Sequence, residues 1–179
     1  MKKVLFLLIA LNSILNGHSQ SNIEYWERGN IQFDSGHYTK AIVEYNKYIE
    51  KDQNFVVAYF CRAGAKRLSN DFKGAIEDYT KVIKLHSTFK EAYCYRGLSK
   101  SNQNNHMGAL ADFNTAIKIS PKYSEAYYHR GLEKIILTQL KSGCLDLQKA
   151  KELGFEKATE AIIENCNYEG TIANIAYTT

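Results

Sequence analysis

The sequence predicts an all-α protein, a right-handed solenoid of four stacked helix pairs that ends in a C-terminal capping helix. Three observations predict this class. The chain repeats itself every 34 residues, small and aromatic residues recur at fixed positions of each repeat, and apolar residues follow helical spacing within it. A constant period of this length is typical of a solenoid, in which each unit buries its apolar face only against its neighbours.

The period is marked by four arginines, and small and large residues keep a fixed register around them. The arginines are Arg28, Arg62, Arg96 and Arg130, and the repeats cover residues 22–55, 56–89, 90–123 and 124–157. Small residues, which let two helices approach closely, occupy position 8 (Gly29, Ala63, Gly97, Gly131) and position 20 (Ala41, Ala75, Ala109, Gly143). Large side chains that fill the adjacent volume occupy position 4 (Tyr25, Tyr59, Tyr93, Tyr127) and position 24 (Tyr45, Tyr79, Phe113, Leu147).

Each repeat is expected to hold two helices, helix A over positions 2–14 and helix B over positions 18–30. Turn-forming residues separate them, as in Asp34-Ser35-Gly36 of the first repeat. Helix B carries an apolar stripe at helical spacing, which in the second repeat consists of Ala75, Ile76, Tyr79, Val82 and Ile83.

This pattern resembles the tetratricopeptide repeat (TPR) family, which combines a large aromatic residue at position 4 with small residues at 8 and 20, an aromatic at 24 and a proline at 32. The resemblance covers residues 22–157, although the proline survives only as Pro121 and position 11 lacks its usual tyrosine. It implies a non-enzymatic protein-binding module without a cofactor. Its A helices would line a concave groove that holds a segment of a partner protein.

The fourth repeat resembles the closing repeat of exported TPR proteins from Bacteroidetes-type bacteria, which end in a glycine-terminated helix, a short capping helix and a cysteine. Gly154 suits the position just after a helix. We expect the capping helix within residues 156–167, followed by a tail at 168–179. A terminal cap is needed because the last repeat has no successor to cover its apolar face.

Two of the four cysteines are expected to form a disulfide. Cys144 and Cys166 lie at similar distances along the chain from the turn between the last two helices. If these helices are antiparallel, both sulfurs stand about 14–15 Å from that turn, at 1.5 Å per residue. Two buried thiols are the alternative. Cys61 and Cys94 occupy unmatched positions of neighbouring A helices, so we expect them to stay unpaired.

Residues 1–19 have the pattern of a secretory signal peptide. Lys2 and Lys3 precede an apolar run, and small residues lie just before a cleavage site after Ser19. The run is shorter than the roughly 20 residues that span a bilayer, and an uncleaved membrane anchor is the alternative. We therefore expect an exported, periplasmic or secreted protein with no transmembrane span after cleavage.

Composition argues against nucleic acid as a partner. Removing the two lysines of the signal lowers the formal net charge from +4 to +2. Binding to nucleic acid calls for a basic stripe, whereas the cationic residues here are interspersed with acids.

An acid follows each of the four arginines after 16 residues, at position 23. We expect ion pairs between helices A and B or between stacked repeats: Arg28–Glu44, Arg62–Asp78, Arg96–Asp112 and Arg130–Asp146. The planar guanidinium suits such partly buried, bidentate pairing. An arginine ladder for an anionic ligand is the alternative, and it is disfavoured because each arginine comes with its own acid.

The candidate peptide-binding residues are side chains at positions 5, 9, 12 and 13 of helix A, which line the concave face of a stacked array. They are Trp26, Asn30, Phe33, Phe60, Gly64, Arg67, Leu68, Leu98, Tyr128, Leu132 and Ile136. An apolar, aromatic surface of this kind is typical of a recognition site, with Trp26, Phe60 and Tyr128 as anchors. Some TPR proteins clamp a C-terminal carboxylate with lysines and asparagines, but only Asn30 fits that set.

Nothing in the sequence indicates an enzyme. The histidines fall at unrelated repeat positions, and no Cys-x-x-Cys or His-x-x-x-His spacing offers a metal site. The alternative to peptide recognition is a structural subunit or homo-oligomer of an envelope assembly. In that case self-association or the tail would fill the groove permanently.

Overall fold

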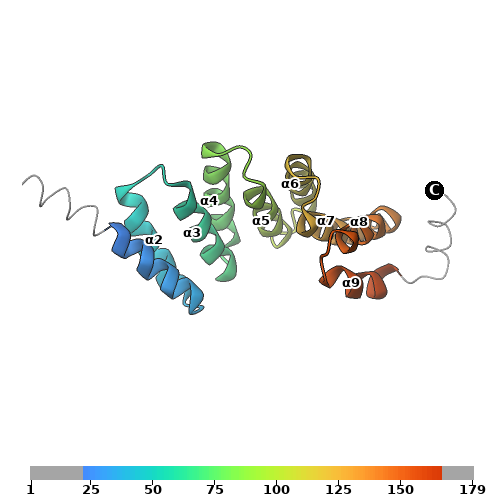
Figure 1. Ribbon diagram of the computed structural model, residues 1–179, viewed down its shortest axis with the longest axis horizontal. Helices are drawn as coiled ribbons and strands as arrows, with labels where there is room; N and C mark the ends of the chain where they lie inside the picture. The colour runs from blue at the N-terminus through green and yellow to red at the C-terminus, as the bar shows by residue number, and fades with distance from the viewer. Residues whose placement is uncertain (1–21, 167–179) are drawn as a thin grey trace, which may run out of the picture. The chain divides into compact units, whose positions relative to one another are not determined.

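The computed structural model describes residues 22–166, and all regular secondary structure in that range is helical (Figure 1). Consecutive helices form four pairs, and one further helix follows them. The predicted all-α class, with four helix pairs and a capping helix, is therefore confirmed. The predicted signal peptide and the predicted tail lie outside the described residues.

Every helix begins and ends within two residues of its expected limits. The first helix covers residues 22–34, and it is followed by α2 (Tyr38–Lys51), α3 (Val56–Leu68), α4 (Phe72–Leu85), α5 (Lys90–Ser101), α6 (His106–Ile119), α7 (Ser124–Ile136), α8 (Leu140–Glu152) and α9 (Lys157–Cys166). None of the described helices is both long and apolar enough to cross a membrane.

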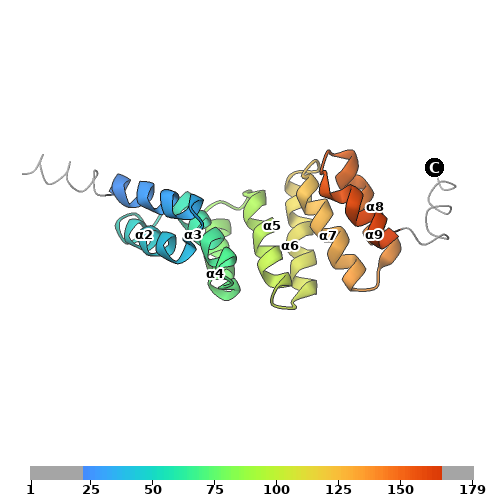
Figure 2. The same ribbon diagram turned by 90° about the horizontal axis from the view of Figure 1, so that it is seen from below.

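The chain divides within α4 into two compact units, one that ends at Lys81 and one that begins at Val82. In the first unit, the first helix lies beside α2 (Figures 1 and 2). Gly29 permits this close approach, because a Cβ atom at this residue would lie only 2.6 Å from the ring of Tyr45. Tyr45 is buried together with Ala41 and Ala65, and this cluster forms the core of the unit.

In the second unit, α7 and α8 approach each other most closely at a pair of glycines. A Cβ atom at Gly131 would lie 2.9 Å from the carbonyl oxygen of Gly143, and one at Gly143 would lie 2.7 Å from the carbonyl oxygen of Gly131. The volume beside this contact is filled by Leu147, which is fully buried, as Phe113 is in the preceding repeat. The small and large positions of the repeat thus act as the sequence predicts.

The turn between helices A and B places position 15 in the left-handed backbone region in all four repeats. The residues are Gly36 (φ 74°), Asn70 (φ 65°), Asn104 (φ 59°) and Thr138 (φ 62°). Glycine and asparagine adopt this conformation readily. Thr138 is β-branched and disfavours it, so the turn of the fourth repeat is the strained one.

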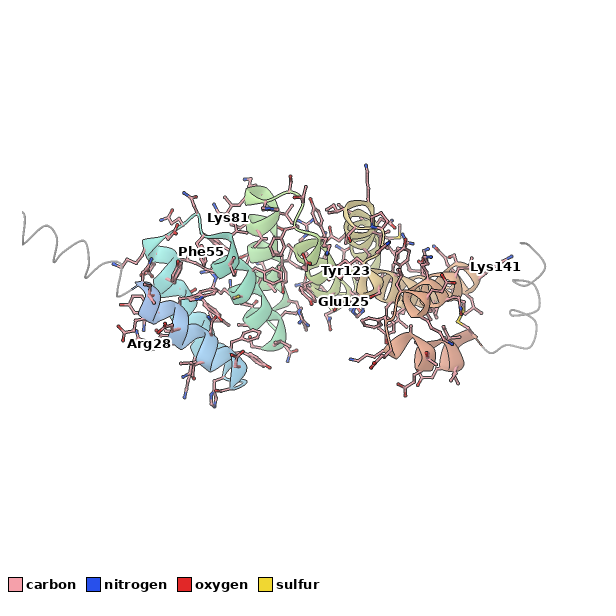
Figure 3. All side chains as sticks on the ribbon, in the orientation of Figure 1. Arg28, Phe55, Lys81, Tyr123, Glu125 and Lys141 are labelled. Atoms are coloured by element: carbon pink, nitrogen blue, oxygen red, sulfur yellow. A yellow bond between two sulfur atoms is a disulfide. The ribbon has the colours of Figure 1, made fainter. Side chains whose placement is uncertain are left out.

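Helix α9 covers the end of the fourth repeat. Gly154 ends α8 with a φ of 85°, as expected for a residue just after a helix. Ala158 and Ala161 of α9 are buried. A disulfide joins Cys144 of α8 to Cys166 of α9, with 5.8 Å between the Cα atoms (Figure 3). Cys61 and Cys94 are free thiols.

Candidate functional site

The four predicted arginine–acid pairs lie between helix A and helix B of the same repeat. In three of them the arginine Nε and Nη2 donate to both carboxylate oxygens of the aspartate, with 2.6 Å between Nη2 and Oδ1: Arg62–Asp78, Arg96–Asp112 and Arg130–Asp146. In the first repeat the Nε of Arg28 donates to Glu44 at 3.1 Å. Each guanidinium also lies over the tyrosine at position 4 of its repeat, 5.1 to 5.5 Å from the ring centroid.

A lysine that the sequence analysis missed completes each of the three aspartate sites. The Nζ atoms of Lys66, Lys100 and Lys134 lie 2.7 to 2.9 Å from the second carboxylate oxygen of the aspartate. All three lysines stand at position 11. Their 34-residue spacing could have revealed these lysines, but at position 11 the sequence analysis noted only that the usual tyrosine is absent.

The remaining arginine nitrogen connects neighbouring repeats. Nη1 of Arg62 donates to Asn46 of α2, and Nη1 of Arg130 donates to Asn114 of α6, both at 2.7 Å. These guanidinium groups bond an aspartate and an asparagine of the chain itself. They therefore serve to hold helices together, and an anion-binding ladder has no support from their geometry.

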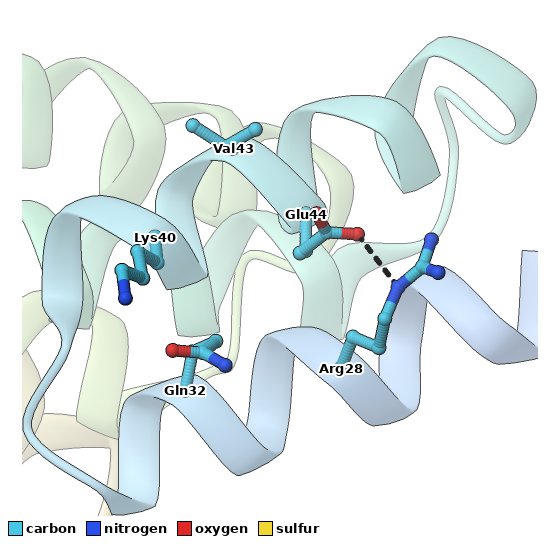
Figure 4. Close-up of a pocket in the computed structure, with 5 residues that line it drawn as sticks. All are labelled: Arg28, Gln32, Lys40, Val43 and Glu44. Carbon is cyan, nitrogen blue, oxygen red and sulfur yellow. Dashed lines mark hydrogen bonds and ion pairs between the residues drawn. The ribbon is translucent and has the colours of Figure 1, made fainter.

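The first repeat departs from this pattern. A surface pocket of about 210 Å³ is lined by the residues that differ (Figure 4). Gln32 replaces the lysine at position 11, and Glu44 replaces the aspartate. Lys40 stands at position 19, where the other repeats have glycine or serine. These three residues line the pocket together with Arg28 and Val43. The Oε1 atom of Gln32 is buried and has no hydrogen-bond partner among the described residues.

Glu44 gives this pocket a fixed negative charge. Its carboxylate accepts from Arg28 and, at 2.8 Å, from Nζ of Lys47. Burial alone would raise the pKa of Glu44, but the hydrogen bond from Lys47 and the charges of Arg28 and Lys47 lower it below its ordinary value. The carboxyl group is therefore ionised at neutral pH.

We call the predicted groove residues of the first unit other than the aromatic pair at position 5 the inner face, and all of them are at least partly exposed: Asn30, Phe33, Gly64, Arg67 and Leu68. The ring of Phe33 lies beside Gly64, where a Cβ atom would be 3.5 Å from it. Leu68, one turn further along α3, is 39% exposed. The hydroxyl of Tyr45 donates to Oδ1 of Asn30 at 2.9 Å, which fixes the orientation of that amide. The first unit thus brings part of the predicted site together.

The predicted anchor residues at position 5 have a different role. Trp26 lies 5.4 to 5.7 Å from the ring centroids of Tyr45, Tyr48 and Phe55, and it packs against the core of the first unit. Phe60 contacts the buried ring of Tyr79 at 5.7 Å. Both rings are thus partly buried against helix B of their own repeat, and their role as anchors for a peptide stays a prediction.

The predicted groove residues Leu98, Tyr128 and Leu132 of the second unit are partly buried. Tyr128 lies 4.7 Å from the ring centroid of Phe155, and burial together with Glu164 and Glu160 of α9 raises the pKa of its hydroxyl. Leu132 packs against the cluster that contains the disulfide, and Leu98 packs against the cluster around Phe113. Of the predicted set, Ile136 is the one that remains well exposed, at 56%. Of these residues, Tyr128 and Leu132 are thus partly covered by the cluster that joins α8 to the capping helix.

No group of histidine, cysteine and acidic side chains within residues 22–166 could hold a metal ion. The thiol of Cys61 has its pKa raised to about 11, mainly by burial and also by the charge of Asp34, so it is protonated at neutral pH.

A second polar cluster joins the third and fourth repeats. Glu133 of α7 is buried, and it accepts hydrogen bonds from Ser101 and, at 2.8 Å, from Nδ1 of His106. Tyr123 donates to Glu125 at 2.9 Å in the same unit (Figure 3). Each of these acids is satisfied by partners within the fold.

No protein-family model and no curated protein matches this sequence. Solved structures do match. The crystal structure of MamA is 22% identical, with a TM-score of 0.72 over 83% of this chain and 86% of that one. The first TPR of Spaghetti (RPAP3), bound to the HSP90 peptide SRMEEVD, is 26% identical, with a TM-score of 0.64 over 67% and 95% of the two chains.

Two further matches are TPR domains by their descriptions. The second TPR domain of human RPAP3, in complex with the HSP70 peptide SGPTIEEVD, is 26% identical, with a TM-score of 0.62 over 65% of this chain and 98% of that one. The TPR domain of Arabidopsis OM64 is 23% identical, with a TM-score of 0.62 over 65% and 97%. The chain therefore has the TPR fold.

Proposed function

We propose that the chain is an exported, non-enzymatic protein-binding module that holds a peptide segment of a partner on the inner face of its first unit. One observation carries the proposal. The ring of Phe33 lies against Gly64, at ordinary contact distance from a Cβ atom there, and exposed Leu68 extends this apolar surface along α3. In the third and fourth repeats the position of Gly64 holds Leu98 and Leu132, which are partly buried and pack against core clusters.

The surface suits a peptide with one bulky apolar side chain next to a hydrogen-bond acceptor. The apolar side chain would lie over Gly64, between Phe33 and Leu68. Because Oδ1 of Asn30 accepts from Tyr45, the amide nitrogen of Asn30 is left to donate to a peptide carbonyl or carboxylate. Apolar contact supplies most of the affinity in such a complex, and the amide fixes orientation.

The solved structures support this assignment by analogy of fold. The two RPAP3 domains are each in complex with a short peptide of a chaperone. The lysines that accompany asparagine in a carboxylate clamp have no counterpart beside Asn30, so we propose a different peptide class for this chain. The proposal of export rests on the N-terminal sequence pattern and is supported by the disulfide, since disulfides persist in oxidising compartments. Membership among exported TPR proteins of Bacteroidetes-type bacteria belongs to the same proposal.

A peptide library displayed on phage tests this function directly. Peptides selected on the purified chain are expected to bind it. Their affinity should fall by about tenfold or more with Leu68→Asp, because the new charge would lie in the apolar contact. Ile163→Asp is the matched control, because it places the same charge at an exposed isoleucine of α9. Selection of no peptide, or peptides equally sensitive to both variants, would contradict the proposal.

The alternative, a homo-oligomer or structural subunit with its inner face filled, predicts a different result in sedimentation. In that case the wild-type chain would sediment as an oligomer, and Leu68→Asp would release monomers. Under the peptide-binding proposal, both forms are monomeric.

A further inference from the structure

The junction between the third and fourth repeats contains a buried carboxylate that lacks the usual partners. Among the described residues four carboxylates are buried, and three of them, Asp78, Asp112 and Asp146, are each bound by one arginine and one lysine. The fourth is Glu133 of α7, whose side chain is 6% exposed. Within residues 22–166 its ionisable partner is His106 of α6, with 2.8 Å between Nδ1 and Oε2.

The first unit shows what the same positions hold when such a junction is apolar. There the ring centroids of Phe33 and Tyr38 lie 5.5 Å apart, and both rings pack against the cluster that contains buried Ala65. Two repeats further along the chain, the equivalent residues are Ser101, His106 and Glu133. The three apolar side chains are thus replaced together by three polar ones that bond one another. The serine hydroxyl and the imidazole Nδ1 both contact the glutamate carboxylate.

The other charged groups of the surrounding helices are paired elsewhere. The lysines next to the junction in the sequence are held by aspartates at 2.7 Å, in the pairs Lys100–Asp112 and Lys134–Asp146. His129, one turn before Glu133 on α7, lies beside Glu125 instead, at 3.9 Å. Among the described residues, the charge of Glu133 is therefore matched by His106, and only while that imidazole is protonated.

We propose that Ser101, His106 and Glu133 form a proton-dependent clamp, so that the packing of the fourth repeat on the third weakens as pH rises. With the imidazole protonated, an ion pair joins α6 to α7. A buried carboxylate without a counter-charge is strongly unfavourable. Histidine loses its proton between about pH 5 and 8, so the stabilisation is present below this range and is lost as pH rises through it. The clamp does not depend on the proposed peptide binding.

Urea denaturation of the full-length chain, followed by circular dichroism at about pH 5.5 and about pH 8.5, tests the clamp. From the lower to the higher pH, the unfolding constant of the wild-type chain should rise about fivefold more than that of His106→Asn. The asparagine amide can still donate to Glu133, but it does not titrate. His86→Asn is the matched control, because His86 is exposed and makes no ion pair with the described residues. This control should keep the pH dependence of the wild-type chain.

A second variant carries the residues that the first unit has at the equivalent positions. The triple change Ser101→Phe, His106→Tyr and Glu133→Ala is expected to fold, because the chain already packs this set of side chains in its first unit. Replacement of a buried ion pair by apolar residues is often neutral or stabilising. The triple variant should lose the same part of the pH dependence as His106→Asn.

Two results would overturn the proposal. One is an equal pH dependence in the wild-type chain, in His106→Asn and in the triple variant. The other is a wild-type chain that gains stability over His106→Asn as pH rises, which would mean that Glu133 needs no protonated imidazole beside it. Because Leu68→Asp leaves this junction unchanged, the clamp and the proposed peptide binding fail separately.

Discussion

At the scale of single residues, the repeated ion-pair site allows a buried ion pair to be compared with a more exposed one in the same chain. Asp112 is buried and holds both Arg96 and Lys100, whereas Glu44 holds an Arg28 side chain that is largely exposed. Because water screens an exposed pair far more than a buried one, the same chemical change should have different effects in the two repeats.

Asp112→Asn is expected to lower the free energy of unfolding by about 2–3 kcal/mol, since it leaves two partly buried cations without a counter-charge. The matched change Glu44→Gln should lower it by less than about 1 kcal/mol. Urea denaturation followed by circular dichroism measures both. Equal effects would mean that the aspartate sites do not determine stability.

A second residue-scale prediction concerns pH and Cys61. Its pKa is raised to about 11, so the neutral thiol is favoured in the folded protein. This contribution to stability is fully present below the pKa of the unfolded thiol and is lost as pH rises toward 11. At pH 8, in a Cys94→Ala background, Cys61 should react with a disulfide reagent about a hundredfold more slowly in the folded chain than in urea. Similar rates would show that the thiol is not shielded as the structure indicates.

At the scale of the helix pair, glycine positions differ in how much space surrounds them. Gly143→Ala is expected to destabilise the chain by about 1–3 kcal/mol, because the new Cβ would meet the backbone of α7 at 2.7 Å. Gly64→Ala meets its nearest neighbour at an ordinary 3.5 Å and should stabilise the chain by up to about 1 kcal/mol through helix propensity. Thermal unfolding of both variants measures the two changes in stability. Destabilisation of equal size would contradict the looser packing around Gly64.

The capping helix gives a prediction at the same scale. The disulfide closes a segment of 22 residues between α8 and α9, so the double change Cys144→Ser and Cys166→Ser should cost about 3 kcal/mol on the chain-entropy estimate. Hydrogen exchange should show the loss first in residues 157–166. A melting temperature that does not respond to a reducing agent would argue that the cap is held by its apolar contacts alone.

Whole-molecule architecture followed from the sequence because period, small residues and turn residues all specify the same helix pair. For that reason the helix limits and the arginine–acid pairs could be predicted from the sequence. The contacts of Trp26 with Tyr45, Tyr48 and Phe55 could not, because the repeat pattern does not say how far position 5 turns toward helix B. The contact of Tyr128 with Phe155 and the acids of α9 near it could not be predicted either, because those residues lie at or beyond the end of the fourth repeat.

The central claim is that partner recognition belongs to the inner face of the first unit, whereas Tyr128 and Leu132 of the second unit pack against the cluster that contains α9. The most direct measurement is an NMR titration of the ¹⁵N-labelled chain with a peptide selected on it. We predict that the largest amide shifts fall on Asn30 to Phe33 and Gly64 to Leu68, with little change in α8 and α9. Shifts concentrated in residues 124–166, or none at all at saturating peptide, would contradict the claim.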